Sequence, residues 1–255
     1  MAAVLETFRL NGRVAIVTGA SRGLGADFAV ALAEAGADVA LVARGDLAPT
    51  AAAITALGRR ALPVAVDIGA PDAAGRILAT VSAQLGPPDI LVNNAGIIRR
   101  AAFLEASEAD WDEVLNVNLR AVFRLSQGFA AALAARRAPG KIINTASLLS
   151  FQGGLRVVSY AAAKSGLAGL TRAMANELAP LGINVNAIAP GYMATDNTAA
   201  LRADPVRQRA ILERIPAGRW GAPADVKGAV VFLASAASDY VHGITLPVDG
   251  GWLAR

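Results

Sequence analysis

Short apolar runs alternate along this chain with longer segments in which apolar and polar residues are mixed. The runs are rich in β-branched residues and apolar throughout, which is typical of strands buried on both faces of a parallel sheet. We predict such strands at residues 14–19, 38–43, 62–66, 89–94, 141–147, 183–190 and 244–249. We predict helices between them, at residues 24–35, 47–58, 71–85, 108–137, 157–181 and 223–236.

The repeated order of strand and helix predicts an α/β fold, with a doubly wound parallel sheet and helices on both faces. A length of 255 residues suits one domain, and no linker, repeat or low-complexity segment divides it. We therefore expect residues 1–255 to form a single domain. Residues 192–222 fit no strand–helix period, and we expect them to form an insertion, a substrate loop, over the carboxyl-terminal edge of the sheet.

Composition excludes several classes of site. The chain has no cysteine, which excludes disulfides, thiol nucleophiles and thiolate metal sites. The single histidine, His242, excludes a histidine cluster, so we expect no metal; His242 itself is expected in a turn before the last strand. The formal net charge is +4 with scattered arginines, which argues against a nucleic-acid partner and favours small anionic ligands.

The pattern of apolar residues gives no sign of a membrane partner. Hydrophobic residues make up 55% of the chain, yet no run reaches the ~18 residues that a membrane span needs. The first ten residues, MAAVLETFRL, lack the basic and apolar regions of a signal peptide. We therefore expect a cytoplasmic protein.

A glycine-rich turn follows the first predicted strand. The sequence TGASRGLG, residues 18–25, has glycines at positions 19, 23 and 25, where a helix is about to begin. Such a turn lets backbone N–H groups approach a pyrophosphate. An ordinary βα turn is the alternative, but the place of the motif after the first strand indicates dinucleotide binding.

Other motifs end strands at the same predicted edge of the sheet. NNAG, residues 93–96, offers small residues against which a flat cofactor ring can lie, or forms a simple turn. Asp67 suits either an adenine amino group or a helix N-terminus. PGYMAT, residues 190–195, suits a ring that carries an amide. The predicted cofactor contacts in these segments are Thr18, Gly19, Ser21, Arg22, Gly23, Leu24, Gly25, Asp67, Ile68, Asn94, Ala95, Gly96, Pro190, Gly191, Met193 and Thr195.

The strongest chemical signal is Ser147, followed by Tyr160 and Lys164. Residues four apart on a helix share a face, so the ammonium lies beside the phenol. A positive charge favours the phenolate and lowers a phenol pKa from its ordinary ~10, which suits proton transfer near neutral pH. Ser147 is then expected to hold the substrate oxygen, although YxxxK also arises by chance on helices.

Asn118 lies inside the predicted helix 108–137. Asparagine is unfavourable there because its amide competes for backbone hydrogen bonds. We interpret it as a local helix distortion that holds a water, with a tolerated polar residue as the alternative.

In order and spacing these motifs resemble those of the short-chain dehydrogenases/reductases, from about residue 8 to the C-terminus. The resemblance implies a Rossmann-type sheet with strand order 3-2-1-4-5-6-7 and a nicotinamide coenzyme. It implies the catalytic tetrad Asn118, Ser147, Tyr160 and Lys164, in which Tyr160 is the general acid/base and Tyr160 and Lys164 also contact the coenzyme. It implies a homotetramer built through helices 108–137 and 157–181 and the C-terminal end.

Within that family, several stretches are similar to the dehydrogenases of keto-sugar acids, which act in pectin and uronate breakdown. They are NNAGIIRR, SLLSFQGG, VNAIAPGYMAT, RIPAGRWG, LASAASDYV and VDGGWLAR. This resemblance implies hydride transfer at a secondary alcohol or ketone of a sugar acid. Gluconate 5-dehydrogenases and 3-oxoacyl carrier-protein reductases are the alternatives among enzymes. A nucleotide-binding redox sensor is the alternative outside them, and the intact Ser–Tyr–Lys set argues against it.

A sugar acid carries a carboxylate, which suits a bidentate guanidinium. Arg99, Arg100 and Arg156 are candidates, and Arg100, just after NNAG, is the one we favour. Gln152 is expected to bond a sugar hydroxyl. The predicted substrate contacts are Arg100, Ser147, Gln152, Arg156 and Tyr160.

The residues after the second strand bear on the choice of coenzyme. An acidic residue at its end would hold the ribose 2′-hydroxyl of NAD. Ala43 occupies that position, Arg44 follows it, and Arg22 lies in the glycine turn. Two arginines without the carboxylate favour the 2′-phosphate of NADP(H), and Arg44 joins the predicted cofactor contacts. Asp46 lies nearby and the keto-sugar acid dehydrogenases are usually regarded as NAD-using, so NAD(H) stays open.

Overall fold

A single parallel sheet forms the centre of the computed structural model, which describes residues 3–255. Its strands lie in the order β3-β2-β1-β4-β5-β6-β7, which confirms the predicted fold class and the strand order that the family resemblance implies. The strands are β1 (Val14–Thr18), β2 (Asp38–Ala43), β3 (Ala61–Ala65), β4 (Ile90–Asn93), β5 (Gly140–Thr145), β6 (Ile183–Pro190) and β7 (Thr245–Val248).

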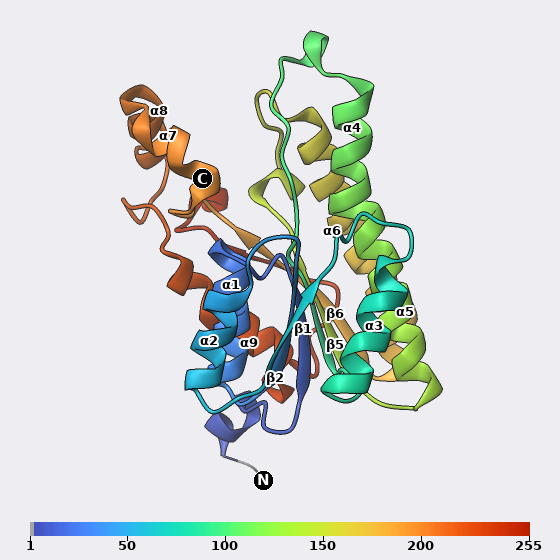
Figure 1. Ribbon diagram of the computed structural model, residues 1–255. Coiled ribbons are helices and arrows are strands. Elements are labelled where there is room, and N and C mark those ends of the chain that lie inside the picture. Colours follow the sequence, from blue (N-terminus) through green and yellow to red (C-terminus); the bar gives the residue numbers. More distant parts are fainter. Residues whose placement is uncertain (1–2) are drawn as a thin grey trace.

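Helices cover both faces of the sheet: α1, α2 and α9 lie on one face, and α3, α4, α5 and α6 on the other (Figure 1). One apolar core, which includes Phe28, packs beneath the first group, and a second, which includes Phe129, beneath the other. The helices are α1 (Gly23–Glu34), α2 (Ala48–Ala56), α3 (Ala73–Gln84), α4 (Glu108–Leu115), α5 (Ala121–Ala135), α6 (Val158–Leu178), α7 (Ala199–Ala203), α8 (Pro205–Leu212) and α9 (Lys227–Ala234).

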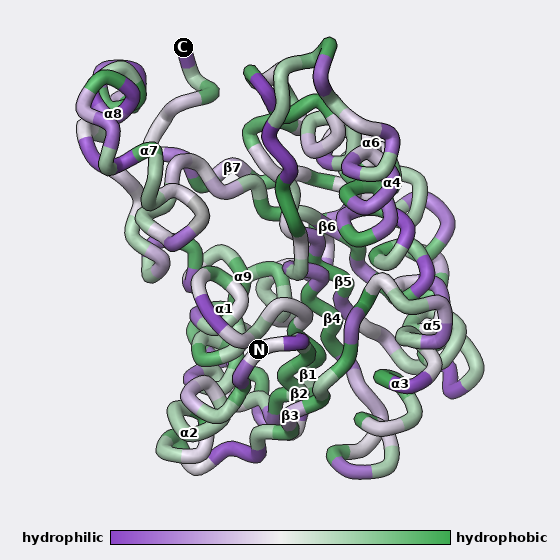
Figure 2. The backbone as a smooth tube through the Cα atoms, turned by 45° about the horizontal axis from the view of Figure 1, so that its top comes forward, coloured by the Kyte–Doolittle hydropathy of each residue, from purple (hydrophilic) through white to green (hydrophobic). Residues whose placement is uncertain are grey.

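The edge strands differ from the inner ones. Every residue of β1, β2, β4 and β5 is buried, and these strands form the hydrophobic centre in Figure 2. Most residues of β3 and β7 are partly or fully exposed, so the prediction of strands buried on both faces is wrong for these two. Each has only one neighbouring strand, which also explains why Pro63 and Pro247 are tolerated there: an edge strand loses little when an N–H is missing.

The predicted helix 108–137 is interrupted. α4 passes into a π-helical turn, Asn116–Arg120, before α5 begins. Such turns insert one extra residue and often occur at functional sites. Asn118 lies in this turn and is fully buried, so the helix is distorted where its sequence is least suited to a regular helix.

The segment between β6 and α9 carries the short helices α7 and α8, which stand at the same end of the sheet as the start of α1 (Figure 1). A parallel bridge between Met193 and Gly221 closes the base of the segment. Ile211 and Ile215 pack it onto Leu148 and Trp252. None of the helices within residues 3–255 is long and apolar enough to cross a membrane.

Candidate active site

The turn after β1 presents backbone rather than side chains to the start of α1. Gly19 and Gly23 have φ of 68° and 56°, in the left-handed region that favours glycine. A Cβ on Gly25 would collide with the carbonyl oxygen of Gly19 and with Asn94 Nδ2, whereas one on Gly23 would meet nothing within 4 Å. The turn therefore combines a helix N-terminus with open space, which is what a phosphate group requires.

Thr18 and Asn94 join the ends of β1 and β4. The backbone N–H groups of Asn94 and Ala95 each donate to Thr18 Oγ1 at 3.0 Å, and Asn94 Nδ2 donates to the Thr18 carbonyl at 3.1 Å. Thr18 is 1% exposed. These two predicted cofactor contacts therefore use their side chains on each other, and hold Ala95 and Gly96 beside the glycine turn.

Ser147 follows β5 and begins a short 3₁₀ turn, Leu148–Ser150. Its Oγ accepts a hydrogen bond from the backbone N–H of Leu149 at 3.2 Å. It also lies near enough to the Tyr160 hydroxyl to lower the pKa of the phenol.

Lys164 lies close to Tyr160, as the spacing predicts. Its Nζ is 5.5 Å from the Tyr160 ring centroid and donates to the Thr145 carbonyl. The side chain is 4% exposed, and burial lowers the pKa of Lys164 to about 8. Tyr160 and Lys164 thus share one face of α6, and Lys164 is also bonded to the end of β5.

The pKa of Tyr160 shifts in the direction opposite to the one predicted. Burial, the largest effect, raises it, while the hydrogen bond with Ser147 and the charge of Arg100 lower it. The phenolate loses more hydration than its neighbours return, so Tyr160 is protonated at neutral pH. Arg100 is thus a cation that lowers the pKa of the phenol, which the spacing of Tyr160 and Lys164 did not predict.

The Asn118 side chain makes two hydrogen bonds, and both are to the backbone of Ile97. Its Oδ1 accepts from the Ile97 N–H at 2.8 Å and its Nδ2 donates to the Ile97 carbonyl at 2.8 Å. The bond holds the segment after NNAG against the π-helical turn.

A buried polar chain that sequence reasoning missed fixes α6 to the sheet. Asn93 Nδ2 donates to Ser126 Oγ and to Asn144 Oδ1, and Asn144 Nδ2 donates to Thr171 Oγ1 at 2.9 Å. Asn144 and Thr171 are both fully buried. An asparagine within the apolar run KIINTAS was the available signal, because a buried amide requires partners.

Exposed ion pairs occupy the predicted adenosine end of the site. Arg44 directly follows β2 and reaches Asp67 at 3.4 Å. Asp67 Oδ1 also accepts from the Gly69 N–H at 2.9 Å. Asp46 Oδ1 accepts from the Ala48 N–H at the start of α2, which commits that carboxylate to the helix.

Residues on either side of these pairs fill different roles. Arg22 reaches Asp196, in the segment after β6, at 3.4 Å, and both side chains are more than three-quarters exposed. Ser21 lies beside Gly45, just after β2. The Leu24 side chain packs against one core and the Ile68 side chain against the other. Only their backbone atoms are therefore left for the predicted cofactor contacts.

The turn after β6 is constrained by the chain's last segment. A Cβ on Gly191 would lie 2.6 Å from the Asp249 Cα, so only glycine fits after Pro190. Met193 is 4% exposed, and Thr195 begins the next 3₁₀ turn. A small hollow of about 190 Å³ lies behind this turn.

The three candidate arginines have different surroundings. Arg99 donates to both carboxylate oxygens of Glu113, at 2.9 and 3.0 Å, so its charge is neutralised on the surface. No acidic side chain within residues 3–255 lies at ion-pair distance from Arg100 or Arg156. Arg156 adopts φ of 63°, and its carbonyl accepts from the Ala101 N–H at 3.2 Å, which joins its loop to the segment after NNAG.

Arg214 is a further cation that the sequence did not single out. It lies 4.1 Å from the Trp252 ring and donates to Gln152 Oε1 at 3.0 Å. It therefore ties the segment after α8 to the loop after Ser147. Gln152 keeps only its amide N–H groups for another ligand.

His242 precedes β7, where a turn residue is predicted, with Nε2 3.0 Å from Asn184 Nδ2. It lies at the start of β7, away from the residues just described. In the described part of the chain no three His, Cys, Asp or Glu side chains gather as a metal site.

Comparison with known proteins agrees with this geometry. Residues 19–253 match the model of a family described as enoyl-(acyl carrier protein) reductase. The chain belongs to the short-chain dehydrogenase/reductase family. It is an oxidoreductase, and the family predicted from its motifs is confirmed.

Individual members of the family are similar over almost their full length. The chain is 56% identical to the 2-dehydro-3-deoxy-D-gluconate 5-dehydrogenase of Escherichia coli, over 99% of this chain and 100% of that one. It is 58% identical, with a TM-score of 0.93, to a crystal structure of a putative 2-deoxy-D-gluconate 3-dehydrogenase from Agrobacterium tumefaciens with bound NADP; 98% of this chain and 99% of that one are covered. It is 40% identical to a 3-oxoacyl-[acyl-carrier-protein] reductase of Vibrio harveyi, over 95% of this chain and 98% of that one.

Proposed function

We propose that this protein catalyses reversible hydride transfer between NADP(H) and a keto-sugar acid, as a 2-dehydro-3-deoxy-D-gluconate 5-dehydrogenase or 2-deoxy-D-gluconate 3-dehydrogenase. The observation that carries the proposal is the grouping of Tyr160 with Ser147, which lowers the pKa of the phenol, and with the buried Lys164, whose Nζ is 5.5 Å from the ring centroid. A redox sensor needs no such proton donor. The higher identity to the sugar-acid enzymes than to the carrier-protein reductase favours the sugar acid as substrate.

The residues of the site fit a nicotinamide dinucleotide, which supplies or accepts the hydride. The backbone of the turn at residues 19–25 holds the pyrophosphate, because the turn leads into the N-terminus of α1 and a Cβ on Gly23 would meet nothing within 4 Å. The segment of residues 94–96 lies beside that turn. Together with Pro190 and Gly191 it forms the boundary of the nicotinamide end of the site.

Tyr160 protonates the developing alkoxide in the direction of reduction. Its raised pKa keeps the phenol protonated at neutral pH, which is the form that a general acid requires. Ser147 donates to the same substrate oxygen and stabilises its charge. Oxidation needs the phenolate, so it is favoured at higher pH.

Lys164 stabilises the phenolate once Tyr160 has given up its proton, and it bonds the ribose of the coenzyme. Its lowered pKa means that it exchanges protons near pH 8. A water on the main chain of the Asn118 turn completes the path by which the proton is replaced, since the Asn118 amide is already bonded to Ile97.

Arg100 binds the substrate carboxylate. Its charge lowers the pKa of the Tyr160 phenol, and no acidic side chain in residues 3–255 lies at ion-pair distance from it. Gln152 and Arg156, on the loop after Ser147, contact the hydroxyl groups of the sugar acid. Residues 192–222 form the substrate loop that covers the opposite side.

NADP(H) is the proposed coenzyme. Arg44 and Arg22 are both largely exposed and their contacts with Asp67 and Asp196 are long, so either guanidinium can turn to a 2′-phosphate. Asp46, the acidic residue that kept NAD(H) open, accepts a hydrogen bond from the Ala48 N–H at the start of α2. Its carboxylate is therefore engaged by the helix and not by the ribose 2′-hydroxyl of NAD. The bound NADP of the Agrobacterium structure supports the same choice.

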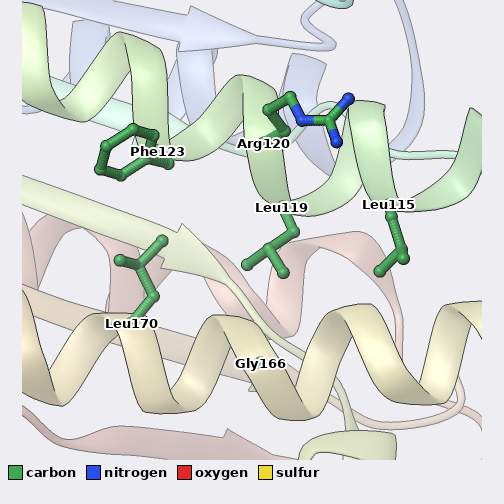
Figure 3. A pocket seen from close by; sticks show the side chains of 6 residues that line it. All are labelled: Leu115, Leu119, Arg120, Phe123, Gly166 and Leu170. Carbon is green, nitrogen blue, oxygen red and sulfur yellow. The ribbon is translucent and has the colours of Figure 1, made fainter. Parts of the chain in front are cut away.

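A homotetramer is the proposed assembly. The helices that the family resemblance names carry an unpartnered apolar hollow of about 420 Å³ between the α4–α5 stack and α6, lined by Leu115, Leu119, Phe123, Gly166 and Leu170 (Figure 3). Phe123 is 44% exposed, and a second copy would bury it. Sedimentation velocity should show tetramers that Phe123→Glu dissociates; a monomeric wild-type protein would contradict this assembly.

A cytoplasmic location is part of the proposal, since reduced nicotinamide nucleotides turn over inside the cell.

The decisive experiment is a panel of keto-hexonates and a short 3-oxoacyl thioester, each assayed with NADPH and NADH. We expect the highest kcat/KM for a 3-deoxy keto-hexonate with NADPH. Turnover of the thioester alone would instead identify a carrier-protein reductase, and coenzyme binding without turnover would identify a sensor.

A further inference from the structure

Two serine hydroxyls connect the loop after β5 to α6. Ser150 Oγ donates to the Lys164 carbonyl at 2.7 Å, and Ser165 Oγ donates to the Leu149 carbonyl at 3.0 Å. Both bonds dock the 3₁₀ turn Leu148–Ser150 on the helix. Only the Ser150 bond involves the backbone of a residue in the catalytic set.

Ser150 also contacts the other end of that set. Its Oγ accepts a hydrogen bond from the backbone N–H of Ser147 at 3.3 Å, in a capping box over the 3₁₀ turn. The Ser150 hydroxyl therefore accepts a hydrogen bond from the Ser147 N–H and donates one to the Lys164 carbonyl. It is a single-atom bridge between β5 and the helix that carries Tyr160.

We propose that Ser150 is a positioning residue, which sets the place of the Ser147 hydroxyl relative to Tyr160 and Lys164. The proposal rests on the catalytic role of Ser147 in the proposed function. The bond between Ser147 Oγ and the Leu149 N–H is local and gives Ser147 no reference to α6. The loop continues through Gly153 and Gly154, which add no side-chain anchor of their own. The Ser150 hydroxyl joins the backbone of Ser147 directly to the backbone of Lys164.

The change Ser150→Ala removes both bonds without adding bulk. A displacement of about 1 Å in a catalytic group can cost up to ~10²-fold, and we expect kcat to fall roughly tenfold with KM for the coenzyme unchanged. Ser165→Ala is the matched control, because it removes the other bond between the same loop and helix; its kcat should stay within about twofold of the wild type. Ser150→Thr retains the hydroxyl and should restore most of the activity.

A double-mutant cycle separates positioning from a loss of general stability. In a Ser147→Ala background there is no hydroxyl to position, so adding Ser150→Ala should change kcat less than about twofold. Equal effects of Ser150→Ala in both backgrounds, or equal losses in Ser150→Ala and Ser165→Ala, would overturn the proposal. The comparison uses any ketone that the wild-type protein reduces, so it is independent of whether the substrate is a sugar acid.

Discussion

Two parts of the proposed site are held in different ways: the wall formed by Ser147, Tyr160 and Lys164, and the rim formed by Arg22, Arg44 and Arg100. Lys164 is buried and donates to the Thr145 carbonyl, and Ser147 Oγ accepts from the Leu149 N–H. Arg22 and Arg44 instead make long, exposed ion pairs with acidic residues on neighbouring segments. Exposed pairs of this kind contribute little to stability, typically ~0–1 kcal/mol. The fold therefore holds Lys164 firmly and leaves Arg22 and Arg44 able to change partners.

The largest effect on kcat should come from a substitution in the wall. Lys164→Met keeps the length of the side chain and removes the ammonium that stabilises the phenolate. We expect kcat to fall by ~10²-fold or more, the lower range for a group in acid–base catalysis. Steady-state assays with the best keto-hexonate measure it, and circular dichroism checks the fold. A decrease below about threefold would remove Lys164 from the catalytic set.

At the rim, Arg100→Ala should act on binding of the acid. Loss of a charged hydrogen bond costs about 1.5–3 kcal/mol, so we expect KM for the keto-hexonate to rise roughly 10- to 100-fold. A neutral sugar analogue should show little change. Arg99→Ala is the control, because that adjacent arginine is neutralised by Glu113 and should leave KM unchanged. Equal increases for the acid and for the neutral analogue would exclude a carboxylate contact.

Arg44→Ala should change the choice of coenzyme. We expect kcat/KM for NADPH to fall roughly tenfold, since one exposed charge-assisted bond to the 2′-phosphate is lost. The value for NADH should change much less, because its ribose carries no phosphate there. Parallel assays with both coenzymes give the ratio, and an unchanged ratio would contradict the NADP(H) proposal.

The pH dependence of reduction should report Lys164. Its pKa is lowered to about 8, so the ammonium is present below that pH and lost above it. Because reduction needs the charged form, kcat/KM should be flat below pH 7 and fall roughly tenfold by pH 9. Lys164→Met should abolish this limb while lowering the whole profile. A wild-type profile that stays flat to pH 9 would contradict the role of the ammonium.

The arrangement of Tyr160 beside Lys164 in the wall could be predicted because it depends on residues that are close in the sequence. A tyrosine and a lysine four apart on a helix meet wherever that helix lies, and glycines after a strand report a backbone shape. The direction of the Tyr160 pKa shift was wrong because it depends on burial, which the spacing of two residues does not contain.

The rim was harder to predict because its contacts join distant segments. Arg214 meets Gln152 across 62 positions, and Arg22 meets Asp196 across 174. Arg99 and Arg100 are adjacent in sequence, yet only one finds a carboxylate, since that depends on how α4 packs. The interruption of the helix at Asn118 lies between these cases: the residue signals a distortion, but its partner Ile97 follows only from the fold.

The most direct test of the account is single-turnover reduction by Tyr160→Phe, followed through the loss of NADPH absorbance. This change keeps the ring against Lys164 and removes only the proton and its bond to Ser147. We predict coenzyme affinity close to that of the wild type and a hydride-transfer rate at least ~10²-fold lower. A variant that reduces the keto-sugar acid at nearly the wild-type rate would contradict the central claim that the buried Tyr160 phenol is the proton donor.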